Sequence, residues 1–106
     1  MNTRRYDCGV DAALDVINGK WKTLIISVLA EESRRFGELK RLVPGISDKV
    51  LTQHLRDLEA RFIVRREVLH DSRVKVKYSL TSVGTSLNDA LGPLCEWGER
   101  LADTDQ

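Results

Sequence analysis

The side chains best suited to chemistry lie on one face of a predicted helix near the middle of the chain. Lys49, Thr52, Gln53 and Arg56 stand at spacings of three, four and seven residues, which places them on one helical face. Lysine and arginine bind phosphates, glutamine can pair bidentately with adenine, and threonine can bond to either. Together with Ser47, just before them, they are candidates for contact with the major groove of DNA. An ordinary helical hairpin with a solvated face would carry the same pattern.

Two helices joined by a tight turn, within residues 36–61, must position this face. Apolar residues at helical spacing mark the first helix, and Pro44-Gly45 ends it because proline removes a helical donor and glycine permits positive φ. Ser47 is a candidate N-cap of the second helix. The apolar face of that helix consists of Val50, Leu51, Leu55 and Leu58. A short helix, a glycine-containing turn and a second helix with a polar face predict a helix-turn-helix.

A predicted β-hairpin follows directly and makes the pattern that of a winged helix. Residues 74–80 alternate apolar and polar at period 2, residues 62–69 form a second run, and a polar turn lies between them. Residues 61–80 hold six basic and two acidic side chains, a local charge of +4, whereas residues 81–106 hold one basic and five acidic ones, a charge of −4. We expect the basic end to face an anion. The expected phosphate contacts are Arg34, Arg35, Arg73, Lys75 and Lys77.

Helical periodicity predicts three further helices. They cover residues 10–17, residues 21–32 and the segment after Thr81, which is an N-cap candidate. The expected buried stripe of the helix over residues 21–32 consists of Trp21, Leu24, Ile25, Val28 and Leu29. The last helix carries an apolar stripe too extensive for a lone terminal helix on so small a domain, so we expect it to pair with the same helix of a second copy. The predicted interface of this homodimer consists of Leu87, Leu91, Leu94, Trp97 and Leu101.

Length predicts one domain over residues 1–106. The elements predicted above give it an α+β fold that is mostly helical, with a two- or three-stranded wing. An arm and first helix would occupy residues 1–19, the helix-turn-helix and wing residues 20–80, and a dimerisation helix residues 81–106. The net charge is only +1, and no apolar run approaches the ~20 residues of a membrane span. We therefore expect a cytoplasmic protein with no membrane partner.

The sequence offers no set of residues for catalysis. It has no paired carboxylates, no nucleophile–base set and no glycine-rich phosphate loop, so we predict neither an enzyme nor a cofactor. Cys8, His54, His70 and Cys95 lack the tight spacing of zinc ligands, so no metal site is predicted.

The two cysteines have different expected roles. Cys8 stands just before a predicted helix, whose dipole favours a thiolate; nearby arginines add to this effect, while Asp7 and Asp11 oppose it. The residues alone leave two alternatives for Cys8, a redox-sensing thiol and a buried structural one. Cys95 lies among the apolar residues of the last helix, which favours core packing. A disulfide framework is not expected from two cysteines in a cytosolic chain.

The chain resembles the HxlR-type family of bacterial winged-helix transcriptional regulators, relatives of the MarR group, over nearly its whole length. The matching pieces are Cys8 before the first helix, LDVINGKWKTLIISVL (14–29), RRFGELKRLVPGISDKVLTQHLRDLE (34–59), VKYSLTSVGTSL (76–87) and CEWGE (95–99). The resemblance implies a homodimer held by the terminal helices and a palindromic operator in double-stranded DNA. It also implies control of small-molecule or redox stress genes, because several relatives use a cysteine at the position of Cys8 to sense oxidants or quinones.

Two features depart from the family pattern. Phe62 stands where family members commonly have a glycine, leading out of the recognition helix, and the wing sequence LHDSRVKV contains no proline. We therefore expect an altered end to that helix and a more mobile wing. An alternative function is a winged-helix module that binds proteins and no DNA; the basic hairpin favours DNA.

Overall fold

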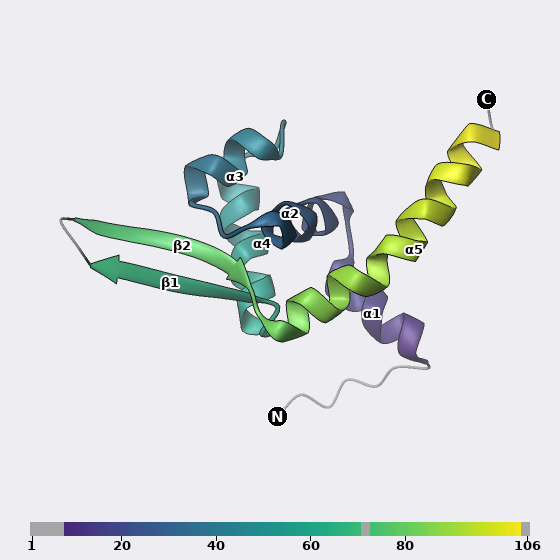
Figure 1. Cartoon of the computed structure of the whole chain (residues 1–106), viewed down its shortest axis with the longest axis horizontal. Coiled ribbons are helices and arrows are strands. Elements are labelled where there is room, and N and C mark those ends of the chain that lie inside the picture. Colours follow the sequence, from purple (N-terminus) through teal and green to yellow (C-terminus); the bar gives the residue numbers. More distant parts are fainter. Residues whose placement is uncertain (1–7, 71–72, 105–106) are drawn as a thin grey trace.

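Helices and a hairpin follow one another in the order that the sequence predicts. The computed structural model describes residues 8–70 and 73–104, so the predicted N-terminal arm and the two central residues of the hairpin turn lie outside the described residues. The elements are α1 (Gly9–Ile17), α2 (Lys20–Glu31), α3 (Phe36–Leu42), α4 (Asp48–Ala60), β1 (Val64–His70), β2 (Val74–Leu80) and α5 (Ser82–Thr104) (Figure 1). The predicted α+β winged-helix fold is confirmed, with a two-stranded wing.

The core lies between α2, α3, α4 and the start of the wing. Its buried residues are Ile25, Ile26, Leu29, Leu39, Val43, Ile46, Leu51, Leu55, Leu58, Ile63 and Val64. The apolar faces predicted for the two helices of the helix-turn-helix are therefore largely buried, but Leu42, predicted for the first of them, is 41% exposed. Leu24 is predicted to share the buried stripe of α2, but it is 45% exposed because it lines an open groove between α2 and α5.

Local hydrogen bonds explain where the helices begin and end. The Ser47 hydroxyl accepts a hydrogen bond from the Val50 amide at 3.1 Å, and the Thr81 hydroxyl accepts one from the Gly84 amide at 3.0 Å, so both predicted N-caps are confirmed. Gly45 ends the turn between α3 and α4 with φ at +90°, a conformation that glycine adopts without strain.

The chain leaves α4 through Phe62, where the sequence predicted an altered end to the helix. Phe62 has φ at +62°, in the left-handed region, and its side chain is 75% exposed. A glycine would adopt this conformation freely, whereas an L side chain is strained there by about 1–2 kcal/mol. The junction between α4 and β1 therefore carries local backbone strain.

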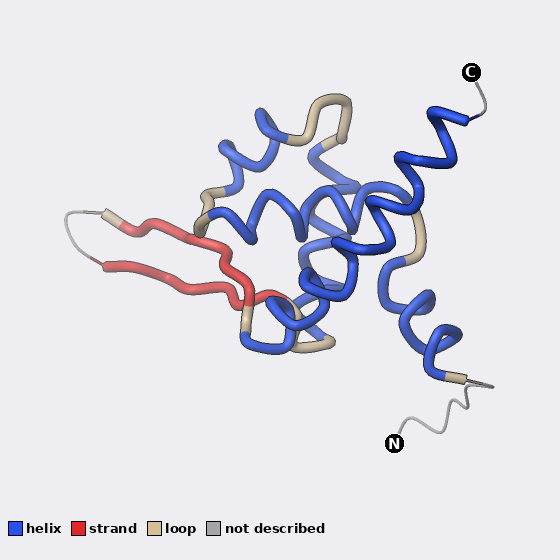
Figure 2. The backbone as a smooth tube through the Cα atoms, turned by 45° about the vertical axis from the view of Figure 1, so that its right-hand side comes forward, coloured by secondary structure: helices blue, strands red, loops and turns tan. Residues whose placement is uncertain are grey.

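The wing is an antiparallel ladder of seven residue pairs, from Val64 opposite Leu80 to His70 opposite Val74. It extends away from the helical body (Figure 2). The segment before α3 joins the wing through a single bridge: the backbone of Arg34 exchanges two hydrogen bonds with that of Tyr78, at 2.9 and 2.7 Å.

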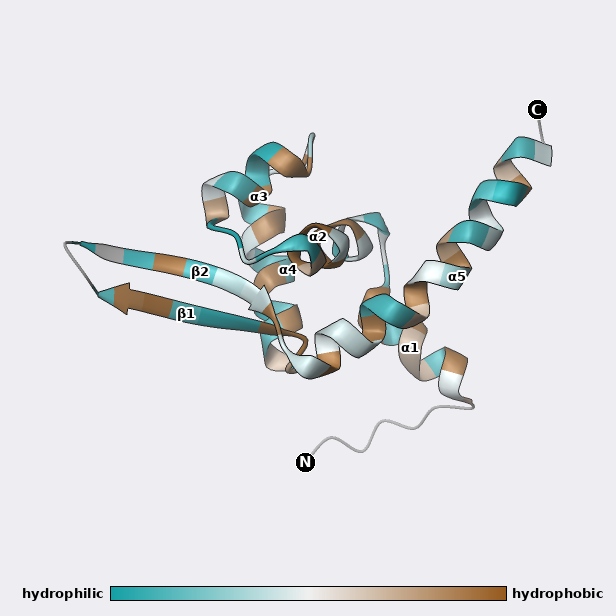
Figure 3. Cartoon of the chain, viewed as in Figure 1, coloured by the Kyte–Doolittle hydropathy of each residue, from teal (hydrophilic) through white to brown (hydrophobic). Residues whose placement is uncertain are grey.

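The last helix begins against the core and then leaves it. Leu87 and Leu91 pack against the core, but Leu94, Trp97 and Leu101 are about half exposed as α5 projects from the body (Figure 3). The prediction that Cys95 packs in the core is wrong for the single chain. Cys95 is exposed, because it lines an open groove between α2 and α5. No helix in the described ranges is long and apolar enough to cross a membrane.

Candidate nucleic-acid interface

The second helix of the helix-turn-helix, α4, is anchored on one face and open on the other. Leu51, Leu55 and Leu58 are buried, whereas Lys49, Gln53 and Arg56 are exposed and Thr52 is half-buried. Ser47 is exposed at the N-terminus, where its hydroxyl caps the helix. The structure therefore brings the predicted major-groove residues together on the free side of α4.

The turn before α4 is held by a residue that sequence reasoning missed. The Lys40 ammonium donates a hydrogen bond to the Ile46 carbonyl at 2.7 Å and lies 3.2 Å from the Asp48 carboxylate. It thereby fixes the turn and offsets the one negative charge in the first turn of α4. Its spacing from Asp48, across a glycine turn, gave no recognisable motif in the sequence.

The wing presents two different faces, because successive side chains of a strand point to opposite sides. Arg66 lies opposite Tyr78 in the ladder, and both face α4. Between wing and helix runs a groove of about 380 Å³, lined by Thr52, Leu55, Arg56, Glu59, Arg66 and Tyr78. Arg66 was counted in the basic segment but not predicted as a contact, since its face depends on the strand register.

Two of the predicted wing contacts lie on the other face. Lys75 pairs with Leu69 and Lys77 pairs with Glu67 across the ladder, on the side opposite Arg66. Both lysines are half-buried, whereas Arg73, just before β2, is exposed.

The two arginines before α3 differ in availability. The Arg34 guanidinium lies 3.0 Å from Glu31 and 4.0 Å from Glu32, and its side chain is only 16% exposed. Arg34 therefore ties the end of α2 to the wing, and a phosphate contact would compete with its acidic partners. Arg35 is exposed, and its backbone amide donates to the Glu38 carboxylate at 2.8 Å. That hydrogen bond holds the pKa of Glu38 below its usual value.

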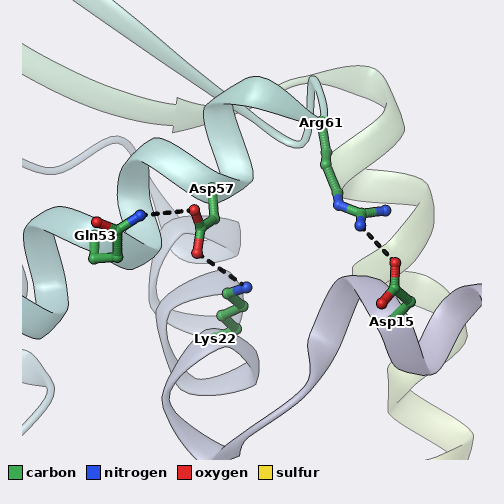
Figure 4. Close-up of polar contacts among 5 residues, drawn as sticks. All are labelled: Asp15, Lys22, Gln53, Asp57 and Arg61. Atoms are coloured by element: carbon green, nitrogen blue, oxygen red, sulfur yellow. Dashed lines mark hydrogen bonds and ion pairs between the residues drawn. The ribbon is translucent and has the colours of Figure 1, made fainter. Parts of the chain in front are cut away.

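A polar network links α2 to the open face of α4 (Figure 4). The Gln53 side-chain amide donates to one Asp57 carboxylate oxygen at 2.9 Å, and the Lys22 ammonium lies 3.4 Å from the other. Burial would raise the pKa of Asp57, but the Gln53 hydrogen bond and the Lys22 charge outweigh it and lower that pKa. Burial, together with Lys22, lowers the pKa of the neighbouring His54, whose Nδ1 is buried without a hydrogen-bond partner among the described residues.

Exposed thiol and apolar groups lie on and beside the terminal helices α1 and α5. Cys8 is the N-cap residue of α1 and is exposed, so the alternative of a buried structural thiol is wrong for the single chain. Between α2 and α5 lies an apolar groove of about 460 Å³, whose lining includes Leu24, Leu91, Leu94 and Cys95. Within the described part of the chain, no three His, Cys, Asp or Glu side chains gather as a metal site.

A helix-turn-helix with an open polar second helix, followed by a basic antiparallel hairpin, defines a winged helix-turn-helix protein. The chain belongs to the HxlR-like helix-turn-helix family, whose family model matches residues 16–106. This is a family of transcriptional regulators, which are not enzymes.

Three relatives illustrate the similarity. The HTH-type transcriptional regulator YtcD of Bacillus subtilis is 45% identical over 98 residues, covering 92% of this chain and 78% of YtcD. The redox regulator HypR in its reduced form superposes with a TM-score of 0.84 at 42% identity, over 92% of this chain and 96% of HypR. Reduced YodB of B. subtilis superposes with a TM-score of 0.80 at 36% identity, over 88% and 92%.

Proposed function

We propose that this transcriptional regulator binds double-stranded DNA in a sequence-specific manner, at an inverted-repeat operator, as a homodimer. The observation that carries the proposal is the open polar face of α4, held in place by a buried apolar face and a capped N-terminus. In this proposal α4 enters the major groove. Its candidate contacts are Ser47, Lys49, Thr52, Gln53 and Arg56.

The groove between α4 and the wing is suited to a DNA backbone. Arg56 and Arg66 supply charge on its two sides, and Thr52 supplies a hydroxyl. Such groups position a duplex without reading its sequence. We therefore add Arg66 to the phosphate contacts proposed from the sequence, which are Arg34, Arg35, Arg73, Lys75 and Lys77.

Exposed apolar side chains on the two terminal helices support the dimer. In α1, Val10 and Leu14 are 67% and 54% exposed, and in α5, Leu94 and Trp97 are 57% and 56% exposed. Apolar surface of this kind on a small domain is typical of a protein–protein interface. A two-fold dimer would place its two α4 helices about 34–36 Å apart along the DNA, or a multiple of this, which is why the operator is expected to be an inverted repeat.

Regulation through Cys8 is the second part of the proposal. The thiol is exposed at the start of α1, and the relatives include a redox regulator and YodB, whose structures include quinone-bound and diamide-treated forms. The sulfur would add to a quinone carbon, forming a C–S bond, while the ring takes up the thiol proton and becomes a substituted hydroquinone. No further reductant is needed for this step.

An ion pair gives α1 a route to the recognition helix. The Arg61 guanidinium, at the C-terminal end of α4, lies 2.6 Å from the Asp15 carboxylate in α1 (Figure 4). A displacement of α1 by an adduct at Cys8 would therefore be transmitted through this ion pair to the C-terminal end of α4. Because a rigid operator tolerates little change in the spacing of two recognition helices, binding should weaken.

A gel-shift titration on genomic fragments at several salt concentrations tests the proposal. We expect tight binding to a few fragments, with an affinity that falls steeply as salt rises. Binding should weaken after quinone treatment in wild type and Cys95→Ser but not in Cys8→Ser. Equal loss in Cys8→Ser would place the signal elsewhere. Absence of salt-dependent binding to any fragment would favour the alternative, a module that binds proteins.

A further inference from the structure

We propose that Lys22 and Asp57 form a positioning pair that fixes the side-chain amide of Gln53 and so determines which base pair α4 prefers. The inference rests on the proposed function, since Gln53 is taken to face the major groove. Neither Lys22 nor Asp57 was singled out in the sequence. They emerge only when α2 and α4 are packed together.

The geometry forms a chain from the core to the DNA-facing surface (Figure 4). The side chain of Lys22 is 9% exposed and that of Asp57 is 41% exposed, while Gln53 is exposed on the open face of α4. Each link uses a different oxygen of the same carboxylate: Oδ1 accepts from Gln53 at 2.9 Å and Oδ2 lies 3.4 Å from the Lys22 ammonium.

The chemistry of the carboxylate gives the network its direction. An ionised aspartate is only an acceptor, so the Gln53 amide must turn its NH₂ group toward Asp57. The flipped amide would set its oxygen against a carboxylate oxygen. One amide hydrogen is thereby engaged, and the carbonyl oxygen and the second hydrogen remain for a base edge. Adenine is recognised by such an acceptor–donor pair, presented in one orientation.

The buried ammonium keeps this arrangement in place. A charge as buried as that of Lys22 is costly unless it is paired, and Asp57 is its partner across the helix interface. Asp57 therefore cannot swing to another partner without leaving the lysine unpaired. The amide of an exposed glutamine, which would otherwise sample many rotamers, is held before DNA arrives.

The test substitutes the carboxylate without changing its shape. In Asp57→Asn the side chain keeps only one acceptor oxygen, whereas the Gln53 amide and the Lys22 ammonium each need one. Either Gln53 or Lys22 therefore loses its acceptor. Lys22→Met keeps the buried stem and removes the charge. Asp57→Glu keeps an acceptor-only group and should retain the wild-type preference. Glu59→Gln is the matched control, because it also removes one negative charge from α4 but points about 200° around the helix from Asp57.

The readout is the preference among all single base-pair variants of the selected operator, compared with overall affinity. We expect Asp57→Asn and Lys22→Met to lower the preference by about 5-fold or more at the base pair affected by Gln53→Ala. Glu59→Gln should change the affinity for all sequences alike. In a Gln53→Ala background, Asp57→Asn should change the affinity for all sequences alike, as Glu59→Gln does, and should leave the base preference unchanged.

Two outcomes would overturn the inference separately from the proposed function. If Asp57→Asn keeps the wild-type preference, the pair does not position Gln53, although DNA binding stands. If wild type itself shows no preference, both ideas fail. The NMR signals of the Gln53 side-chain amide in the DNA-free protein give an independent readout. They should shift in Asp57→Asn and Lys22→Met, and unchanged signals in both would refute the positioning role.

Discussion

The junction between the recognition helix, the wing and α5 depends on one glycine, and the consequence can be worked out from the structure. A Cβ atom at Gly84 would lie 2.2 Å from the Ile63 carbonyl oxygen and 3.1 Å from a Leu80 methyl group. The first distance is more than 1 Å shorter than ordinary contact, and its partner is backbone, which cannot rotate away. The same Ile63 oxygen accepts hydrogen bonds from the Thr81 amide at 3.0 Å and hydroxyl at 3.2 Å.

Gly84→Ala should therefore destabilise the protein, although alanine is the better helix former. Forcing a methyl group into a packed site costs about 1–3 kcal/mol. Each strained hydrogen bond at Ile63 costs a further ~0.5–1.5 kcal/mol. The helical preference for alanine over glycine returns only about 0.5–1 kcal/mol. The net loss in the free energy of unfolding is about 1–5 kcal/mol, which lowers the melting temperature by roughly 4 °C or more.

Gly37→Ala is the matched control. Gly37 is also helical, and a Cβ atom there would meet nothing within 4 Å. The same substitution should raise stability by up to about 1 kcal/mol at this site. Thermal unfolding of wild type and both variants measures whether each substitution raises or lowers the stability. All three should be measured at one protein concentration, because the melting temperature of a dimer depends on concentration. A Gly84→Ala variant as stable as wild type would refute the close approach of α5 to Ile63.

Four further predictions follow from the same geometry. Leu94→Glu should yield folded monomers by sedimentation, whereas Leu91→Glu should mainly lower stability, because Leu91 packs against its own core. Arg66→Ala should weaken binding to all DNA sequences alike and reduce the salt slope by about 1. Folding lowers the pKa of His54 below 6.5, so the neutral form of this side chain favours the folded state. The free energy of unfolding should therefore have its full value above pH 6.5 and fall below it, and the fall should be smaller in His54→Gln. Asp15→Asn should still form the quinone adduct at Cys8, measured by mass spectrometry, but its DNA affinity should fall less than that of wild type after quinone treatment.

The elements of the fold could be predicted because local signals agree with the packing. The caps at Ser47 and Thr81, the turn at Gly45 and the period-2 alternation of residues 74–80 all specify local structure through backbone chemistry. The structure confirms each of them. A helix-turn-helix followed directly by a hairpin already indicated a winged helix, and the family resemblance agreed with that assignment.

What the sequence did not reveal depends on which surfaces meet. Periodicity placed Leu24 and Cys95 on apolar faces, but a face is buried only if another element covers it. Both residues are exposed in the single chain, where α5 extends beyond the helical body. Arg66 could not be separated from Lys77 without the register that sets them on opposite faces of the wing. The links from Lys22 to Asp57 and from Arg61 to Asp15 join residues far apart in sequence.

Sequencing the DNA that the protein selects from fragmented genomic DNA tests the central claim most directly. An α4 helix that reads the major groove, presented twice by a two-fold dimer, predicts an enriched inverted repeat with half-site centres 10–10.5 base pairs apart or a multiple of that. Gln53→Ala should alter the enriched bases within each half-site. Enrichment of no sequence, or of the same sequence by wild type and Gln53→Ala, would contradict the assignment of α4 as the helix whose glutamine reads the bases.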